Sequence, residues 1–252
     1  MNLYFEMLKY PVFTMDKAAE YYNSIESARS AVKRLIKRGM VVKIRKNLYT
    51  CVSGESGEPI ADRFQVGSAL SETACISHHT AAEYYGITDQ VYYDVYVTSD
   101  TRFNSFDFEG YTYVCIKPKI NVGICEPEYS GGIKITDLER TIIDSIKDMD
   151  RISGLEEVIS MIDMAGPLDQ KKLLQYMKAY NCRFLYQKAG YLLWNRREKL
   201  GLDSDFFEKC KAETGKSRRY LSRDITRGKY LEEWGLIVAD DDAWIKNGEE
   251  GQ

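Results

Sequence analysis

The chain has 252 residues, of which 44% are hydrophobic and 29% are charged. This composition is typical of a soluble globular protein, and the length predicts one or two domains at about 100–200 residues per domain. The longest apolar runs fall well short of the ~18 residues that a membrane-spanning helix needs. Residues 1–10 lack the basic start and long apolar core of a signal peptide. These features argue against a membrane or secreted protein and predict a cytoplasmic one.

The formal net charge is −3, which taken alone argues against binding to an anionic polymer. The charge is unevenly spread, however. Residues 1–52 hold ten Lys/Arg against four Asp/Glu, whereas residues 53–252 hold 25 against 34. The first segment therefore carries +6 and the second −9. A basic head on an acidic body indicates an anionic partner at the N-terminal end.

Local signals in residues 12–39 predict two helices joined by a turn. Thr14 can cap a helix that runs to about Tyr22, and Ser24 can cap a second helix that runs to about Arg38. Gly39 then ends the second helix, as glycine commonly does. The apolar residues of the second helix recur at spacings of three and four and so share one face: Ile25, Ala28, Val32, Leu35 and Ile36.

The residues that follow predict a basic β-hairpin. Segments 40–44 and 48–51 are rich in β-branched and aromatic side chains, and Asn47 between them tolerates a positive φ. The order helix, turn, helix and basic hairpin is typical of a winged helix-turn-helix. We assign this domain to residues 1–52.

A continuous basic run covers the second helix and the hairpin, with eight Lys/Arg and no acid between Ser27 and Asn47. Such a helix can enter the major groove of double-stranded DNA, where some side chains reach base edges and others hold phosphates. The alternative is that the basic helix face is simply solvated and that neither the helix nor the hairpin after it binds a ligand. The predicted contacts are base edges for Arg29, Ser30 and Lys33, phosphates for Arg34, Lys37 and Arg38, and backbone or minor groove for Lys43, Arg45 and Lys46.

The remainder of the chain predicts a linker and a mixed body. Residues 53–60 have the Gly- and Ser-rich composition of a linker. Residues 61–135 combine short helices with Tyr- and Val-rich strands, for which we expect a small antiparallel sheet. Residues 136–252 are mainly helical, with capping signals near Thr136 and Asp169. The predicted fold class is α+β, with a winged helix-turn-helix at 1–52, a linker at 53–60 and an α+β domain at 61–252.

Nothing in the sequence predicts a metal, a cofactor or an enzyme. The six cysteines form no C-x-x-C pair and are expected to be reduced thiols, and the two histidines, His78 and His79, are adjacent and point apart on a helix. The Gly-Lys-Ser at 215–217 lacks the earlier glycine of a phosphate loop, because Cys210 stands there. Arg140 and Asp144 are spaced as a helix ion pair.

A metal-dependent nuclease is the one enzymatic alternative considered. Such a site needs a carboxylate two residues before a lysine, and the nearest match, Cys115-Ile116-Lys117, has a thiol in place of the acid. Asp94, Asp107 and Glu109 are the carboxylates from which an unrecognised site would have to be built.

Several segments in this order resemble the AbiEi-type antitoxins and transcriptional regulators of bacterial type IV toxin–antitoxin and phage-defence systems. The resemblance spans most of the chain. One departure is Asn47, where the family usually has glycine before Leu-Tyr. The segments are 45–50 (RKNLYT), 76–82 (ISHHTAA), 84–86 (YYG), 135–144 (ITDLERTIID) and, less specifically, 234–238 (WGLIV).

The resemblance implies two roles. The N-terminal domain would bind inverted repeats in the protein's own promoter and repress its operon. The rest of the chain would antagonise a nucleotidyltransferase-type toxin from the same operon without a stable direct complex. Two alternatives stay open: a transcriptional regulator without a toxin partner, and the DNA-targeted nuclease described above.

Overall fold

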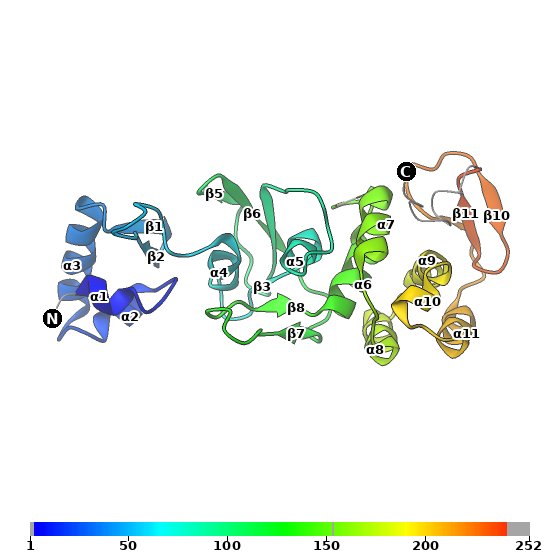
Figure 1. The fold of residues 1–252 in the computed structure, drawn as a ribbon, viewed down its shortest axis with the longest axis horizontal. Helices are drawn as coiled ribbons and strands as arrows, with labels where there is room; N and C mark the ends of the chain where they lie inside the picture. Colours follow the sequence, from blue (N-terminus) through cyan, green and yellow to red (C-terminus); the bar gives the residue numbers. More distant parts are fainter. Residues whose placement is uncertain (1–2, 153, 241–252) are drawn as a thin grey trace. The chain divides into compact units, whose positions relative to one another are not determined.

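The structure is a computed structural model that describes residues 3–152 and 154–240 (Figure 1). The chain divides into two compact units, which are described separately. Unit 1 comprises the residues up to Ile76, Tyr93–Lys117 and Cys125–Ile135, and unit 2 comprises Ser77–Tyr92, Pro118–Ile124 and the residues from Thr136 onward. Within the described residues, every helix is too short or too polar to cross a bilayer.

The N-terminal part of unit 1 consists of three helices and a hairpin, in the order predicted from the sequence except for the first helix. Thr14 Oγ1 accepts a hydrogen bond from the Lys17 amide, and Ser24 Oγ accepts one from the Ser27 amide, so both predicted N-caps are confirmed. The short first helix was not predicted. The elements are α1 (Leu3–Met7), α2 (Met15–Ala19), α3 (Ile25–Lys37), β1 (Val41–Arg45) and β2 (Leu48–Cys51).

These elements enclose a hydrophobic core of their own. Residues from α1, α2, α3, β1 and β2 pack together, including the fully buried Met7, Ala18 and Ala28. Two backbone hydrogen bonds join Phe13 to Tyr49 of β2, at 2.8 and 2.9 Å. They form an antiparallel β-bridge beside the hairpin. The predicted turn residues have the expected backbone, with φ +69° at Gly39 and +60° at Asn47. This core lets the N-terminal segment hold a rigid outer surface.

Residues 53–60, predicted as a linker, form a structured turn. The Ser53 amide donates to the Glu58 carbonyl at 2.8 Å, and Ser53 Oγ accepts bonds from the amides of Glu55 and Ser56. A β-bridge between Val52 and Pro59 closes the segment on itself. The Gly- and Ser-rich composition that predicted a linker therefore belongs to a tight turn, because Gly and Ser are common in both.

The rest of unit 1 is built on a six-stranded sheet whose strand order is β5-β6-β4-β3-β8-β7. Two of the boundaries between the units fall within β7 and β8, at residues 124/125 and 135/136. The helix α4 (Arg63–Ser68) packs on this sheet, and a Cβ at Gly67 would lie only 2.5 Å from the Ile76 side chain. The strands are β3 (Cys75–Ile76), β4 (Asp94–Thr98), β5 (Phe106–Phe108), β6 (Tyr111–Ile116), β7 (Ile124–Cys125) and β8 (Ile135–Thr136).

The sheet differs from the expected antiparallel one. Antiparallel pairs are present at β3–β4 and β5–β6, but β3–β8 and β4–β6 are parallel. The chain returns from the end of β4 through residues 99–105 before the β5–β6 hairpin, so β6 runs in the same direction as β4. The fold class is thus mixed α+β, with a larger and more mixed sheet than predicted.

Unit 2 is mainly helical and ends in a second, smaller sheet. Its core is one continuous cluster that draws on α6, α7, α8, α9, α11 and the final strands. The strand order of the small sheet is β10-β11-β9. The elements are α5 (His78–Tyr84), α6 (Leu138–Asp148), α7 (Gly154–Met164), α8 (Gln170–Tyr180), α9 (Arg183–Trp194), α10 (Arg197–Leu200), α11 (Ser204–Glu213), β9 (Arg219–Tyr220), β10 (Lys229–Leu231) and β11 (Leu236–Val238).

Two capping predictions in unit 2 have different outcomes. Asp169 caps α8 as predicted, accepting bonds from the amides of Lys171 and Lys172. The helix predicted to start from Thr136 is capped instead by Asp137, whose carboxylate accepts from the Arg140 amide at 2.9 Å. Thr136 belongs instead to β8, which pairs with β3 through Ile135.

Candidate nucleic-acid interface

Helix α3 separates a buried face from a basic exposed one. Ala28, Ala31, Val32 and Leu35 are buried against the N-terminal core. Ile36, predicted to share that face, is 39% exposed because its position lies at the margin of the buried stripe. All six predicted contact residues of this helix are exposed, namely Arg29, Ser30, Lys33, Arg34, Lys37 and Arg38.

Acidic neighbours neutralise little of this charge. Arg29 lies 3.9 Å from Glu26, and both side chains are largely exposed, so the pair is weak. Within the described residues, Lys33, Arg34, Lys37 and Arg38 have no ion-pair partner. The exposed face of α3 therefore presents a nearly uncompensated positive charge.

The hairpin contributes two exposed cations rather than three. Lys43 and Lys46 are exposed, as predicted. Arg45 is half-buried, and its guanidinium lies over the rings of Phe103 and Phe106 at 5.4 and 5.3 Å. The reason is an irregularity in the β1–β2 register between Lys43 and Arg45, since a bulge re-aims the side chain that follows it.

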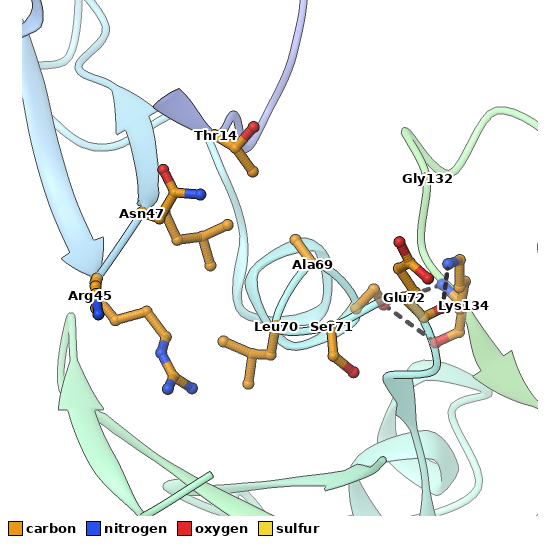
Figure 2. A pocket seen from close by; sticks show the side chains of 12 residues that line it. Thr14, Arg45, Asn47, Ala69, Leu70, Ser71, Glu72, Gly132 and Lys134 are labelled. Atoms are coloured by element: carbon orange, nitrogen blue, oxygen red, sulfur yellow. Dashed lines mark hydrogen bonds between the residues drawn. The ribbon is translucent and has the colours of Figure 1, made fainter. Parts of the chain in front are cut away.

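Arg45 extends from the hairpin into a pocket of about 510 Å³ within unit 1, also lined by the end of α4 (Figure 2). Leu70 and Ser71 lie opposite the hairpin in this pocket, and Lys134 on the far wall donates to the Glu72 carbonyl at 2.8 Å. Within the described residues Arg45 Nη1 is buried without a hydrogen-bond partner. In this structure Arg45 thus belongs to the pocket and not to the exposed basic face.

Asn47 has a structural role that the sequence did not reveal. Its Oδ1 accepts a hydrogen bond from the Met15 amide at 3.0 Å, and its Nδ2 donates to Asp16 at 3.4 Å. The turn of the hairpin is thereby tied to the start of α2. Glycine would supply the positive φ at this position but not the hydrogen bonds.

The adjacent histidines lie in unit 2 and are both buried. His78 has φ +55° and its Nε2 lies 3.5 Å from Asp148, while His79 stacks on Tyr92 with ring centroids 4.0 Å apart. The two rings thus have different partners. Among residues 3–152 and 154–240, no group of three or more His, Cys, Asp or Glu side chains is placed to hold a metal ion.

Asp148 is the most perturbed acid near these histidines. Burial acts to raise its pKa, but hydrogen bonds and charge from His78 and Lys147 outweigh burial and hold the pKa well below its ordinary value. Lys147 Nζ donates to this carboxylate at 2.6 Å. The arrangement keeps Asp148 ionised, which suits a structural ion pair.

The predicted Arg140–Asp144 ion pair exists and is buried. Arg140 Nε lies 2.6 Å from Asp144 Oδ1, with the two side chains 2% and 1% exposed. The guanidinium also donates to the carbonyls of Val122 and Ile120, and Tyr180 donates to Asp144. Burial, followed by the charge of Asp144, raises the pKa of Tyr180. This network ties the segment 118–124 to α6 and α8.

The carboxylates considered for a nuclease lie on β4, β5 and the turn after β5. Asp107 accepts a hydrogen bond from Thr112 Oγ1 at 2.7 Å, and Glu109 occupies the turn with φ +48°. Asp94 and Lys117 are exposed at the ends of β4 and β6. The registers place Asp94 and Asp107 on either side of Thr112 of β6. Within the part of the chain that the structure describes, these carboxylates do not join a third His, Cys, Asp or Glu in a group that could hold a metal ion.

A comparison with known proteins supports the fold. A scan against models of protein families and a search of curated proteins find no match. Among solved structures, the chain is similar to the Rv2827c protein from Mycobacterium tuberculosis, with a TM-score of 0.62 and 13% sequence identity. The match covers 90% of this chain and 86% of that one. At this identity the likeness extends to the fold alone.

Proposed function

We propose that residues 1–52 form a winged helix-turn-helix that binds double-stranded DNA, with α3 in the major groove. The observation that carries this proposal is the exposed face of α3, where six polar or basic side chains are presented over a packed core and only one faces an acid. A helix of this kind fits the major groove and a following hairpin fits the adjacent backbone.

The exposed residues divide by their expected contacts. Arg29, Ser30 and Lys33 lie toward the start of α3, where a recognition helix meets base edges. The later cations of the helix hold phosphates, and two hairpin lysines touch the backbone beyond them. The phosphate-contacting set is Arg34, Lys37, Arg38, Lys43 and Lys46. Arg45 is left out of this set because it is half-buried over two phenylalanine rings.

Fluorescence anisotropy of the full chain with a duplex of its own promoter tests this assignment. Each phosphate contact contributes a slope of about −0.9 to the plot of log affinity against log salt concentration. Changing Arg34, Lys37 and Arg38 together to Gln should weaken binding and make the slope shallower by about 2.7. The matched control is Gln at three exposed lysines of unit 2, Lys119, Lys171 and Lys178.

The control variant carries the same change in net charge and should bind like the wild type. If duplex binding weakens equally in both variants, the effect comes from net charge and not from α3, which contradicts the proposal. A chain that binds no duplex in a salt-dependent way, its own promoter included, would refute it.

At the level of the cell, we propose that the protein represses its own operon and acts as the antitoxin of a type IV system against a nucleotidyltransferase-type toxin. The ordered motifs of residues 45–50, 76–86 and 135–144 support this proposal. An adjacent reading frame for a nucleotidyltransferase would favour it over a regulator without a toxin partner. In cells that express such a toxin, the α3 variant should lose repression and still rescue growth. Loss of rescue with the protein folded and expressed would contradict the separation of the two roles.

A further inference from the structure

The small sheet at the end of unit 2 has one face fixed to the helical core. Leu236 and Val238 of β11 are fully buried. The Trp234 ring lies against Gly190 of α9, and Gln187 Nε2 donates to the Trp234 carbonyl at 3.0 Å. These contacts hold the sheet in place and determine which of its faces points outward.

The opposite face carries a row of two tyrosines and an isoleucine. The registers place Tyr230 of β10 beside Ile237 of β11, and Ile237 beside Tyr220 of β9. Side chains at paired positions point to the same side of a sheet. Tyr220 is 45% exposed and Tyr230 40% exposed. We call this row, Tyr230-Ile237-Tyr220, the tyrosine face.

The segment that carries this face is strongly basic. Residues 215–231 hold six Lys/Arg and a single acid, Asp224. The Arg218 guanidinium lies 4.5 Å from the centroid of the Tyr230 ring, which places a cation directly on the tyrosine face. Arg218, Arg223 and Arg227 are exposed, and none of them has an ion-pair partner among the described residues. Positive charge and partly exposed tyrosine side chains therefore occur together on this sheet.

We propose that the tyrosine face binds single-stranded nucleic acid, with bases stacked on Tyr220 and Tyr230 and phosphates held by Arg218, Arg223 and Arg227. Exposed aromatic rings in a basic segment suit unpaired bases, which offer a π-face and a charged backbone at once. Paired bases in a duplex are stacked on one another and cannot use the rings. The combination therefore favours a single strand over duplex DNA.

This site goes beyond the proposed operator binding and is independent of it, because its residues all belong to unit 2 and those of α3 to unit 1. The test uses the full chain and fluorescein-labelled 15-nucleotide strands of one unstructured sequence, made as RNA and as DNA. Anisotropy is measured at two salt concentrations. Two strands of one sequence separate recognition of the 2′-hydroxyl from stacking and charge shared by both.

Two variants divide the binding into its charged and aromatic parts. Gln at Arg218, Arg223 and Arg227 should weaken binding at least tenfold and make the salt slope shallower by about 2, at about 0.7 per single-strand contact. Ala at Tyr220 and Tyr230 should weaken binding at least tenfold and leave the salt slope unchanged. Phe at both positions should retain binding, which keeps the test valid if the Ala variant folds poorly.

The controls are the variants designed above. Gln at Lys119, Lys171 and Lys178 matches the charge change of the arginine variant and should bind like the wild type. The α3 variant should lose promoter duplex and keep the single strand. The proposal is overturned if neither strand binds, if both tyrosine-face variants bind as well as the control, if the α3 variant loses the single strand equally, or if a duplex of the same sequence binds this face more tightly.

Discussion

Asp144→Ala should strongly destabilise unit 2, because it removes the counter-charge of a buried arginine. Arg140 is 2% exposed, and its Nε lies 2.6 Å from Asp144 Oδ1. Without that carboxylate the guanidinium would be a buried and uncompensated charge. Tyr180 would also lose the acceptor of its hydroxyl.

The size of the effect can be worked out from the contacts that remain. Breaking a buried ion pair by removing one partner costs about 3–5 kcal/mol of unfolding free energy. The guanidinium would keep its bonds to the carbonyls of Val122 and Ile120, so the lower end, about 3 kcal/mol, is expected. For a protein of this size each kcal/mol lowers the melting temperature by about 2–4 °C, which predicts a drop of about 6–12 °C.

Urea unfolding followed by tryptophan fluorescence measures this effect, because Trp194 and Trp234 both belong to the helical core of unit 2. The matched control is Lys209→Ala, which breaks another i,i+4 ion pair, Asp205–Lys209, whose two side chains are more than half exposed. The control should unfold at nearly the wild-type midpoint.

A second variant separates lost charge compensation from lost packing. Replacing Arg140 with Met and Asp144 with Leu removes both charges and keeps apolar volume, so it should recover most of the lost stability. If Asp144→Ala and Lys209→Ala shift the urea midpoint equally, burial does not increase the contribution of the Arg140–Asp144 pair to stability, and the reasoning is refuted.

Two further predictions concern acid stability and the hairpin. The pKa of Asp148 is lowered by His78 and Lys147 against the effect of burial, so this group contributes stability above pH ~4 that is lost as the pH falls further. Asp148→Asn should therefore flatten the acid limb of the stability profile, and an unchanged limb would contradict it. At Asn47, Ala should destabilise more than Gly, because only Ala strains the φ of +60° while both lose the bond from Met15. A lower melting temperature for the Gly variant than for the Ala variant would contradict this prediction.

Local chemistry made the N-terminal elements predictable from the sequence. A cap needs only one side chain and an amide three residues away, so Thr14 and Ser24 marked the starts of α2 and α3. A positive φ needs only the residue itself, so Gly39 and Asn47 marked the turns. The exposed basic face of α3 followed from the helical period alone, apart from the marginal Ile36.

Features that depend on distant partners were not predictable. The parallel pairing of β4 with β6 depends on where the chain returns through residues 99–105, which no local pattern records. Strands of two or three residues, such as β9 and β11, are too short for alternation to show. The i,i+4 spacing predicted the Arg140–Asp144 pair but not its burial. The sequence also predicted an exposed Arg45, because the irregular register of the hairpin cannot be read from the residues alone.

Net charge is a poor guide to partners in this chain, because binding depends on how charge is grouped on a surface. A net charge of −3 coexists with an almost uncompensated basic face on α3 and with residues 215–231, which carry six cations and one acid. At physiological salt, interactions between exposed charges separated by more than about 8 Å are largely screened. Acids farther than this from either surface therefore weaken it little. Local charge density and the shape beneath it, a helix in one case and an aromatic sheet face in the other, determine what each can bind.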